Sequence, residues 1–299
     1  MARVIVITSG KGGVGKTTTT SNIGMSLARL GHPTLLIDAD VGLRNLDLLL
    51  GLENRIIYTG LDVLNDVCRL EQAVIQDKRQ PNLSFFPISS NRAETTITTS
   101  QVKTLIDKVK DNYDYVLVDS PAGIDNGFQT AISCATESIV IVTPEVPSIR
   151  DADRVIGILM SKNITKIHLV INRLRPSMVK TDDMMSIEDV TNILGVSLLG
   201  VIPDSEKIIV ASNRGEPIVL ESKNSLPRVA FDNTAKRLTG DNVDFLDFNI
   251  GLETKLTPHG HWPSFNVADS CICVAAFFLI LSTFLAEDKG KDEGGGESK

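Results

Sequence analysis

A glycine-rich segment near the N-terminus has the spacing of a phosphate-binding loop. Residues 10–17 read Gly-Lys-Gly-Gly-Val-Gly-Lys-Thr and match the pattern G-x-x-x-x-G-K-[ST], between a predicted strand and a predicted helix. The glycines allow backbone N–H groups to surround phosphate oxygens at the N-terminus of that helix. Lys16 can reach the β- and γ-phosphates of a nucleotide, and the Thr17 hydroxyl can bind Mg²⁺. Spacing and context together favour nucleotide binding over a glycine-rich turn with a surface lysine.

Three aspartates stand at the ends of predicted strands. Asp38 and Asp40 follow a run of Leu and Ile, and Asp119 closes the apolar stretch that begins at Tyr115. Ligands of open α/β sheets bind at the carboxyl ends of the strands, so these side chains are placed to act on one ligand. Two carboxylates beside a phosphate loop suit a metal ion and a water molecule. The alternative is that each aspartate caps a turn or a helix.

An asparagine stands at the same predicted edge of the sheet. Asn172 follows the apolar run that ends at Ile171. Its amide offers one donor and one acceptor, which can pair with the edge of a nucleotide base. The alternative is an asparagine that caps a turn.

The elements that would position these residues alternate along the chain. Short β-branched runs alternate with helical stretches, as expected for parallel strands buried on both faces. One helical stripe is Ile23, Leu27 and Leu30, and another is Val155, Ile158 and Leu159. We therefore predict an α/β fold with a doubly wound, mostly parallel sheet flanked by helices. The predicted strands cover residues 4–8, 34–37, 115–119, 139–143, 166–171 and 197–201.

Composition limits the classes of protein that need to be considered. The chain has 299 residues, of which 42% are hydrophobic and 22% are charged, which excludes a disordered chain and a disulfide-stapled miniprotein. The formal net charge of −7 argues against broad, nonspecific binding of nucleic acid. The four cysteines are too few and too unevenly spaced for a disulfide framework.

The character of the sequence changes after residue 249. We predict one domain over residues 1–249, an irregular linker over 250–266, an apolar segment over 267–286 and a disordered charged tail over 287–299. The seventeen residues from Ser270 to Ala286 carry no charge, and a membrane-spanning helix needs about 17 at the least. The apolar segment is therefore a candidate membrane anchor. Its two cysteines, with His259 and His261 upstream, fit no metal-site spacing.

Lys11 occupies a position at which an ordinary phosphate loop needs no lysine. Residues 11–18, Lys-Gly-Gly-Val-Gly-Lys-Thr-Thr, resemble the deviant Walker A motif of the ParA/MinD ATPases. The resemblance implies a P-loop ATPase in which Lys11 reaches across a nucleotide-sandwiched dimer to the phosphates held by the partner, somewhat as an arginine finger does. It also implies that Asp40 orients the attacking water, that Asp38 lies beside the metal, and that Asp119 holds the Mg²⁺ shell through water.

The motif and the resemblance together give a set of expected site residues. Catalytic roles are expected for Lys11, Lys16 and Asp40. Mg²⁺ is expected at Thr17, Asp38 and Asp119. Contacts to ATP are expected from Lys11, Gly12, Gly13, Val14, Gly15, Lys16, Thr17, Thr18, Asn172, Arg173, Pro203 and Asp204.

Further segments resemble one branch of this family, the septum-site-determining ATPases of cyanobacterial and plastid type. The resemblance covers residues 1–249 and rests on residues 42–47, 50–55, 77–79, 144–146, 150–154 and 183–186. It implies a homodimer on ATP that binds an anionic membrane surface and recruits a MinC-like division inhibitor. A MinE-like stimulator of hydrolysis then releases the dimer. The expected location is the stroma and inner envelope of a chloroplast, or a bacterial cytoplasm on the inner membrane.

The sequence departs from that branch after the domain. Such proteins end in a short basic amphipathic helix, whereas residues 249–266 hold Lys255 as their one Lys or Arg and suggest no such face. A spanning anchor would make membrane attachment permanent, which conflicts with a cycle of binding and release. Two functions remain as alternatives to division-site placement. One is a DNA-partition ATPase of the ParA type, and the other is an ATP-binding scaffold that does not cycle because its tail is altered. An iron–sulfur carrier ATPase is disfavoured because no C-x-x-C occurs.

Overall fold

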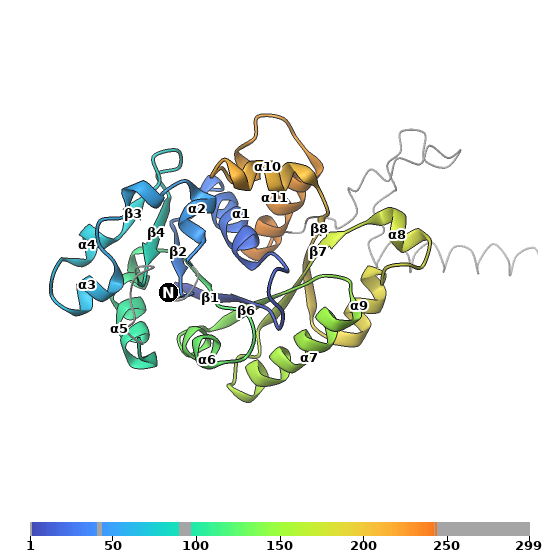
Figure 1. The fold of residues 1–299 in the computed structure, drawn as a ribbon, viewed down its shortest axis with the longest axis horizontal. Helices are drawn as coiled ribbons and strands as arrows, with labels where there is room; N and C mark the ends of the chain where they lie inside the picture. Colours follow the sequence, from blue (N-terminus) through green and yellow to red (C-terminus); the bar gives the residue numbers. More distant parts are fainter. Residues whose placement is uncertain (1, 41–43, 90–96, 242, 244–299) are drawn as a thin grey trace, which may run out of the picture. The chain divides into compact units, whose positions relative to one another are not determined.

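A central sheet organises the part of the chain that the computed structural model describes, residues 2–40, 44–89, 97–241 and 243. Within those residues, eight strands follow the order β3-β4-β2-β5-β1-β6-β7-β8 (Figure 1). All neighbouring strands are parallel except β3 and β4. The strands are β1 (Arg3–Thr8), β2 (Thr34–Asp38), β3 (Ile75–Gln76), β4 (Leu83–Pro87), β5 (Tyr115–Asp119), β6 (Glu137–Val142), β7 (Ile167–Leu174) and β8 (Ser197–Pro203).

Helices cover both faces of the sheet, which confirms the doubly wound α/β fold. Helices α1, α2, α10 and α11 lie on one face, and α5, α6, α7 and α9 lie on the other (Figure 1). The helical elements are α1 (Lys16–Arg29), α2 (Leu46–Leu50), η1 (Glu53–Arg55), α3 (Gly60–Leu64), α4 (Leu70–Ala73), α5 (Thr99–Val109), η2 (Lys110–Asn112), α6 (Asn126–Ile132), α7 (Val146–Ser161), α8 (Pro176–Lys180), α9 (Ile187–Leu194), α10 (Glu206–Asn213), η3 (Ile218–Leu220) and α11 (Leu226–Thr239).

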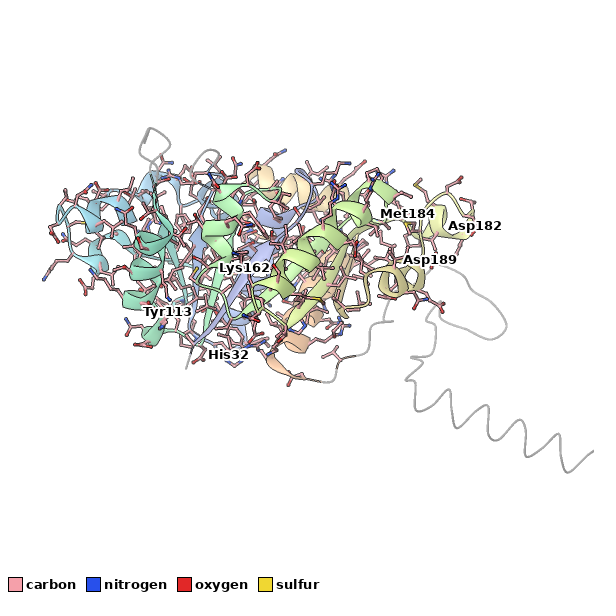
Figure 2. All side chains as sticks on the ribbon, turned by 90° about the horizontal axis from the view of Figure 1, so that it is seen from below. His32, Tyr113, Lys162, Asp182, Met184 and Asp189 are labelled. Carbon is pink, nitrogen blue, oxygen red and sulfur yellow. The ribbon has the colours of Figure 1, made fainter. Side chains whose placement is uncertain are left out.

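The face covered by α7 and α9 is seen in Figure 2. Lys162 stands at the C-terminal end of α7, and Asp189 lies on α9. Asp182 and Met184 lie in the connection between α8 and α9, beyond the end of β7. No helix among the described residues is long and apolar enough to span a bilayer. The predictions for residues 250–266, 267–286 and 287–299 lie outside the described residues.

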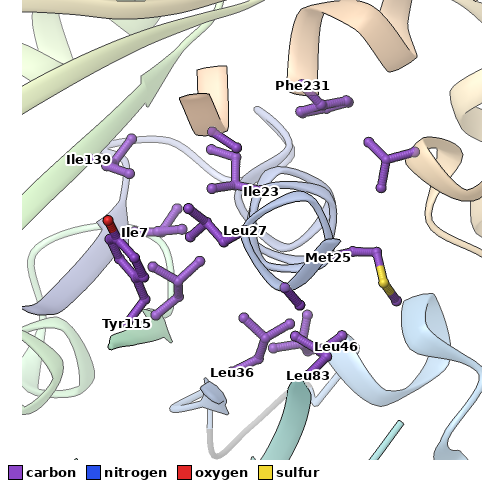
Figure 3. Packing of buried hydrophobic residues seen from close by; sticks show 14 of the residues in the cluster. Ile7, Ile23, Met25, Leu27, Leu36, Leu46, Leu83, Tyr115, Ile139 and Phe231 are labelled. Atoms are coloured by element: carbon purple, nitrogen blue, oxygen red, sulfur yellow. The ribbon is translucent and has the colours of Figure 1, made fainter. Parts of the chain in front are cut away.

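Helix α1 runs through the middle of the core, so the loop before it is held in place by the whole domain. Ile23, Met25 and Leu27 of α1 are completely buried among side chains of the sheet and of α11 (Figure 3). Gly24 permits a close approach to β2, because a Cβ there would lie 2.3 Å from Leu36 Cδ2. Burial of such apolar side chains contributes about 1.5–3 kcal/mol each.

An ion cluster around the buried carboxylate of Glu137 lies at the edge of the sheet where the parallel strands begin. Glu137 of β6 accepts hydrogen bonds from Arg3 Nε at 2.8 Å and Nη2 at 2.6 Å, and Lys166 Nζ lies 3.0 Å away. Burial alone would raise the pKa of Glu137, but the hydrogen bonds from Arg3 and the ammonium group of Lys166 outweigh it and hold that pKa well below its ordinary value. The cluster therefore fastens β1, β6 and β7 at the edge opposite the predicted site.

Two details differ from the sequence-based expectation. Strands β3 and β4 were not predicted, because the five residues of β4 include Ser84 and end in Pro87. Leu30 does not continue the stripe of Ile23 and Leu27, since α1 ends at Arg29 and Leu30 is 41% exposed. Gly31 follows with a φ of +98°, a left-handed conformation that turns the chain away from the helix.

Candidate functional site

The glycine-rich loop joins the end of β1 to the start of α1, as its spacing predicted. Gly13 and Gly15 have φ values of +76° and +100°, which favour glycine. Gly15 is the N-cap of α1, so the unpaired N–H groups of the first helical turn face the loop. Gly10 also requires its lack of a side chain, because a Cβ there would lie 2.5 Å from the backbone of Asp151 in α7.

Lys16 is folded back over this loop rather than extended into solvent. It is 9% exposed, and its Nζ donates a hydrogen bond to Ser9 Oγ at 3.1 Å. Burial lowers the pKa of Lys16, while the charges of Asp119 and Asp40 act in the opposite direction. A buried ammonium group beside open backbone N–H groups is suited to bind phosphate.

Lys11 has a different environment from Lys16. Its side chain is 46% exposed, and its Nζ lies 3.6 Å from Glu145 Oε2 at the N-cap of α7. It is also absent from the residues that line the cavity above the loop. Lys11 therefore lies outside the residues that line the cavity, and its ammonium group faces Glu145.

Two predicted carboxylates lie side by side at the carboxyl edge of the sheet. Asp38 and Asp119 are register partners on β2 and β5, and they are 3% and 2% exposed. Thr20 Oγ1 donates to Asp119 Oδ1 at 3.2 Å. Burial raises the pKa of Asp119 to about 6. Hydrogen bonds from Thr17 and Thr20 and the charge of Lys16 act in the opposite direction and lower it. Burial, followed by the charge of Asp119, raises the pKa of Asp38 to about 8.

Asp38 also binds backbone N–H groups of Asp40 and of the start of α2. Its Oδ1 accepts the Asp40 N–H at 3.1 Å, and its Oδ2 accepts the N–H groups of Asn45 and Leu46 at 3.3 and 3.1 Å. Asp38 thus satisfies backbone donors at the N-terminal end of α2. Asp40 lines the same cavity as Lys16 and Thr17.

The donor set at this edge fits Mg²⁺. Mg²⁺ takes oxygen ligands and usually keeps several waters, with one or two carboxylates and substrate phosphates completing its shell. Asp119, Asp38 and the Thr17 hydroxyl supply such oxygens, and a divalent cation would favour the charged forms of the two carboxylates, whose pKa values are raised mainly by burial. The described residues contain no group of three or more His, Cys, Asp or Glu placed to hold a metal. Water and phosphate would therefore supply the remaining ligands.

A cavity of about 810 Å³ opens above the loop. It contains the expected site residues Gly12, Gly13, Gly15, Lys16, Thr17, Thr18, Asp40 and Arg173. Val14 is instead buried in the core at 3% exposure, below the loop. The opposite walls come from α2 and from the end of α10.

A second cavity of about 550 Å³ adjoins the first and shares Gly15, Thr18, Arg173 and Ser212 with it. It contains Asn172, Pro203 and Asp204, so the structure brings together the residues expected to hold the base.

Asn172 does more than face the second cavity. Its Nδ2 donates to the Val14 carbonyl at 2.8 Å, and its Oδ1 accepts the N–H of Arg173 at 3.0 Å. It thus joins β7 to the phosphate loop and stabilises Arg173, which has a φ of +58°. Asn172 therefore does bind neighbouring backbone, as the turn-capping alternative predicted. One hydrogen on Nδ2 and one lone pair on Oδ1 remain for a nucleotide base.

Comparisons with known proteins agree with this geometry. The family model "CobQ/CobB/MinD/ParA nucleotide binding domain" matches residues 5–218. A septum site-determining MinD protein of Emiliania huxleyi is 66% identical over 254 residues, which are 85% of this chain and 93% of the relative. The chain belongs to the MinD family of septum site-determining proteins.

Solved structures of MinD-family proteins share the fold. A MinC:MinD cell division protein complex of Aquifex aeolicus matches with a TM-score of 0.76 and 49% identity over 82% of this chain and 98% of that one. MinD of Pyrococcus horikoshii complexed with Mg-ADP matches with a TM-score of 0.72 and 30% identity, over 80% and 96%. A second family model, "Signal peptidase (SPase) II", matches only residues 229–285, which is too little of the chain to assign a family.

Several cavity residues of this MinD-family chain were missed from sequence. Arg175 donates to Asp204 Oδ2 at 2.6 Å and fixes that carboxylate beside the second cavity. Ile208 and Ile209 of α10 provide apolar surface for a planar base. The sequence shows them as part of a short apolar run, but nothing local indicates that Ile209 would be 61% exposed. The other residues that line the first cavity and were missed are Asn45, Leu48, Leu49, Gly51, Glu53, Ser120, Ala122, Ser212, Asn213, Arg214 and Gly215.

Proposed function

We propose that the chain is an Mg²⁺-dependent ATPase that dimerises on ATP, binds a membrane surface and places the division septum. The placement of Lys11 is the observation that carries this proposal. Lys11 is 46% exposed and its ion-pair contact is to the exposed Glu145, so a second copy can reach it, whereas the buried Lys16 serves the loop's own phosphates. The Mg-ADP complex of the Pyrococcus horikoshii relative supports the choice of cofactor.

The site residues have separate tasks in this proposal. Lys16 and the backbone N–H groups of the loop bind the phosphates, and Asp40 orients the water that attacks the γ-phosphate. Mg²⁺ held near Thr17, Asp38 and Asp119 would neutralise charge that develops on the phosphate oxygens. The base lies between Asn172 and the α10 wall.

Dimerisation would also control the membrane and the partners. Two weak membrane contacts joined in one dimer give a firm attachment without any new chemistry, and hydrolysis reverses it. The MinC:MinD complex of Aquifex aeolicus supports a MinC-like inhibitor as a partner, and a MinE-like stimulator of hydrolysis completes the cycle. The location proposed is a chloroplast or a bacterial cytoplasm. The net charge of −7 disfavours the DNA-partition alternative.

Substitution of Lys11 tests the dimer step. We expect the molar mass of the unmodified chain, measured by light scattering with Mg²⁺ and ATP, to double relative to its value in ADP. Lys11→Ala should remain monomeric in ATP while it still binds a fluorescent ATP analogue, because Lys16 and the loop are intact. Lys162→Ala removes an exposed lysine at the far end of α7 and should dimerise normally. A dimer of undiminished stability in Lys11→Ala would contradict the proposal.

A further inference from the structure

The segment Asp77-Lys78-Arg79, which follows β3, makes contacts that the proposed chemistry does not explain. The Asp77 side chain is 1% exposed, and its Oδ1 accepts the backbone N–H of Arg79 at 2.7 Å. The same carboxylate accepts Arg79 Nε at 3.0 Å and Nη2 at 2.6 Å. This paired contact fixes the plane of the guanidinium group and leaves some of its five N–H donors for other acceptors.

The remaining donors of Arg79 bind the ends of two helices. Nη2 donates to the carbonyl of Leu50, the last residue of α2, at 2.5 Å. Nη1 donates to the carbonyl of Gly215, which follows α10, at 3.2 Å. Carbonyl groups at helix C-termini lack intrahelical partners and carry partial negative charge, so a cation there is favourable. One arginine therefore connects α2 with α10.

The two helix ends approach each other as closely as their backbones allow. Gly51 and Gly215 have φ values of +62° and +65°. A Cβ on Gly51 would lie 2.8 Å from the Gly215 carbonyl oxygen, and a Cβ on Gly215 would lie 2.8 Å from Gly51 Cα. Helices α2 and α10 thus meet through bare backbone, and Arg79 binds carbonyl groups on both sides of that contact.

This contact forms the wall of the nucleotide cavity opposite the phosphate loop. Leu48, Gly51 and Gly215 line the cavity together with Lys16 and Asp40. At its N-terminal end, α2 is held by the carboxylate of Asp38, as described above. The short helix after the Asp40 segment is therefore fixed at both ends, by Asp38 and by Arg79.

We propose that Arg79, oriented by Asp77, is a positioning residue for ATP hydrolysis. It fixes α2 against α10, which keeps the cavity wall in place. It also steadies Asp40, because Asp38 binds both the start of α2 and the Asp40 N–H. This inference rests on the proposed ATPase function. Arg79 itself is absent from the residues that line the cavity, so its effect passes through α2. Lysine cannot replace Arg79. A single ammonium group cannot make two parallel hydrogen bonds to the Asp77 carboxylate and also bind the carbonyl groups of Leu50 and Gly215.

The test compares Arg79→Gln and Arg79→Lys with a matched control, Arg55→Gln. Arg55 also binds a backbone carbonyl: its Nη1 donates to Gln76 O of the outermost strand, β3, at 2.7 Å. No hydrogen bond joins Arg55 to α10 among the described residues. Three quantities are measured on the full chain. They are hydrogen exchange in residues 46–52 and 206–216, the Kd of a fluorescent ATP analogue, and the kcat and KM for ATP.

We expect exchange in both segments to become roughly tenfold faster in the two Arg79 variants, because charged hydrogen bonds that hold the helix ends are lost. Their Kd should change by less than about threefold, since the phosphate loop is untouched, while kcat falls by roughly tenfold as Asp40 loses its fixed position. Arg55→Gln should match the unmodified chain in all three. Arg79→Lys should restore neither the slow hydrogen exchange nor the kcat of the unmodified chain.

Two results would overturn the inference. One is unchanged exchange and kcat in Arg79→Gln. The other is a parallel loss of nucleotide affinity, kcat and thermal stability, which would give Arg79 a general structural role. If the unmodified chain hydrolyses no ATP, the proposed function fails. The hydrogen-exchange data then still decide whether Arg79 holds α2 against α10. Equal exchange in Arg79→Gln and the unmodified chain would reject that role, whether or not the chain hydrolyses ATP.

Discussion

Replacement of Lys16 by alanine is expected to abolish nucleotide binding. Lys16 is the buried cation of the phosphate loop, and the loop offers its phosphates no second buried ammonium, because Lys11 is directed to Glu145. We expect the Kd of a fluorescent ATP analogue to rise by at least a hundredfold, about 2.8 kcal/mol. The lost interaction is a charge-assisted contact made by the ammonium group of a lysine that is only 9% exposed, and such contacts are stronger away from solvent.

Two controls accompany this measurement. Lys11→Ala should keep its affinity for the same analogue, which separates the two lysines of the motif. Because Lys16 also compensates the charge of Asp119, the thermal unfolding of Lys16→Ala must be recorded to confirm that the variant is folded. A folded Lys16→Ala protein with ordinary nucleotide affinity would remove the phosphate-binding assignment of the loop.

Replacement of Asp40 by alanine should separate binding from turnover. Asp40 lines the cavity with Lys16 and Thr17, but its segment is held by the Asp38 carboxylate through backbone groups that the substitution leaves intact. We expect nucleotide affinity and ATP-dependent dimerisation to persist, while kcat falls by roughly 10²–10⁴, the usual contribution of a positioned acid or base.

Asp40→Asn is the matched variant for that experiment. It keeps the size of the side chain, removes its charge and replaces one acceptor oxygen by an NH2 donor. A similar loss of kcat in both variants would show that the carboxylate acts on the attacking water, whereas undiminished phosphate release in Asp40→Ala would remove that role from Asp40.

The phosphate loop was predictable because its determinants are local. Gly13 and Gly15 are needed for backbone conformations that few other residues adopt, and the strand before the loop and the helix after it are visible in the sequence. The carboxylates were also predictable, since aspartates that end parallel strands meet at one edge of the sheet. Asp38 and Asp119 are in fact register partners.

The walls of the cavity were not predictable in the same way. Gly51 and Gly215 are distant in sequence, and only the fold shows that their backbones touch. Arg79 belonged to a segment that resembled one branch of the family, but neither its residue type nor its spacing indicated that it joins α2 to α10. Tertiary contacts decide which glycines and arginines serve the site.

Sedimentation of the full chain with anionic lipid vesicles, in ATP and in ADP, tests the central claim of a nucleotide-dependent membrane switch most directly. A chain that ends at Asn249 and the Lys16→Ala variant serve as controls. We predict that the full chain pellets with vesicles in ATP and stays in the supernatant in ADP, and that Lys16→Ala does not pellet in either nucleotide. Equal pelleting of the full chain in both nucleotides, or none in ATP, would contradict the switch.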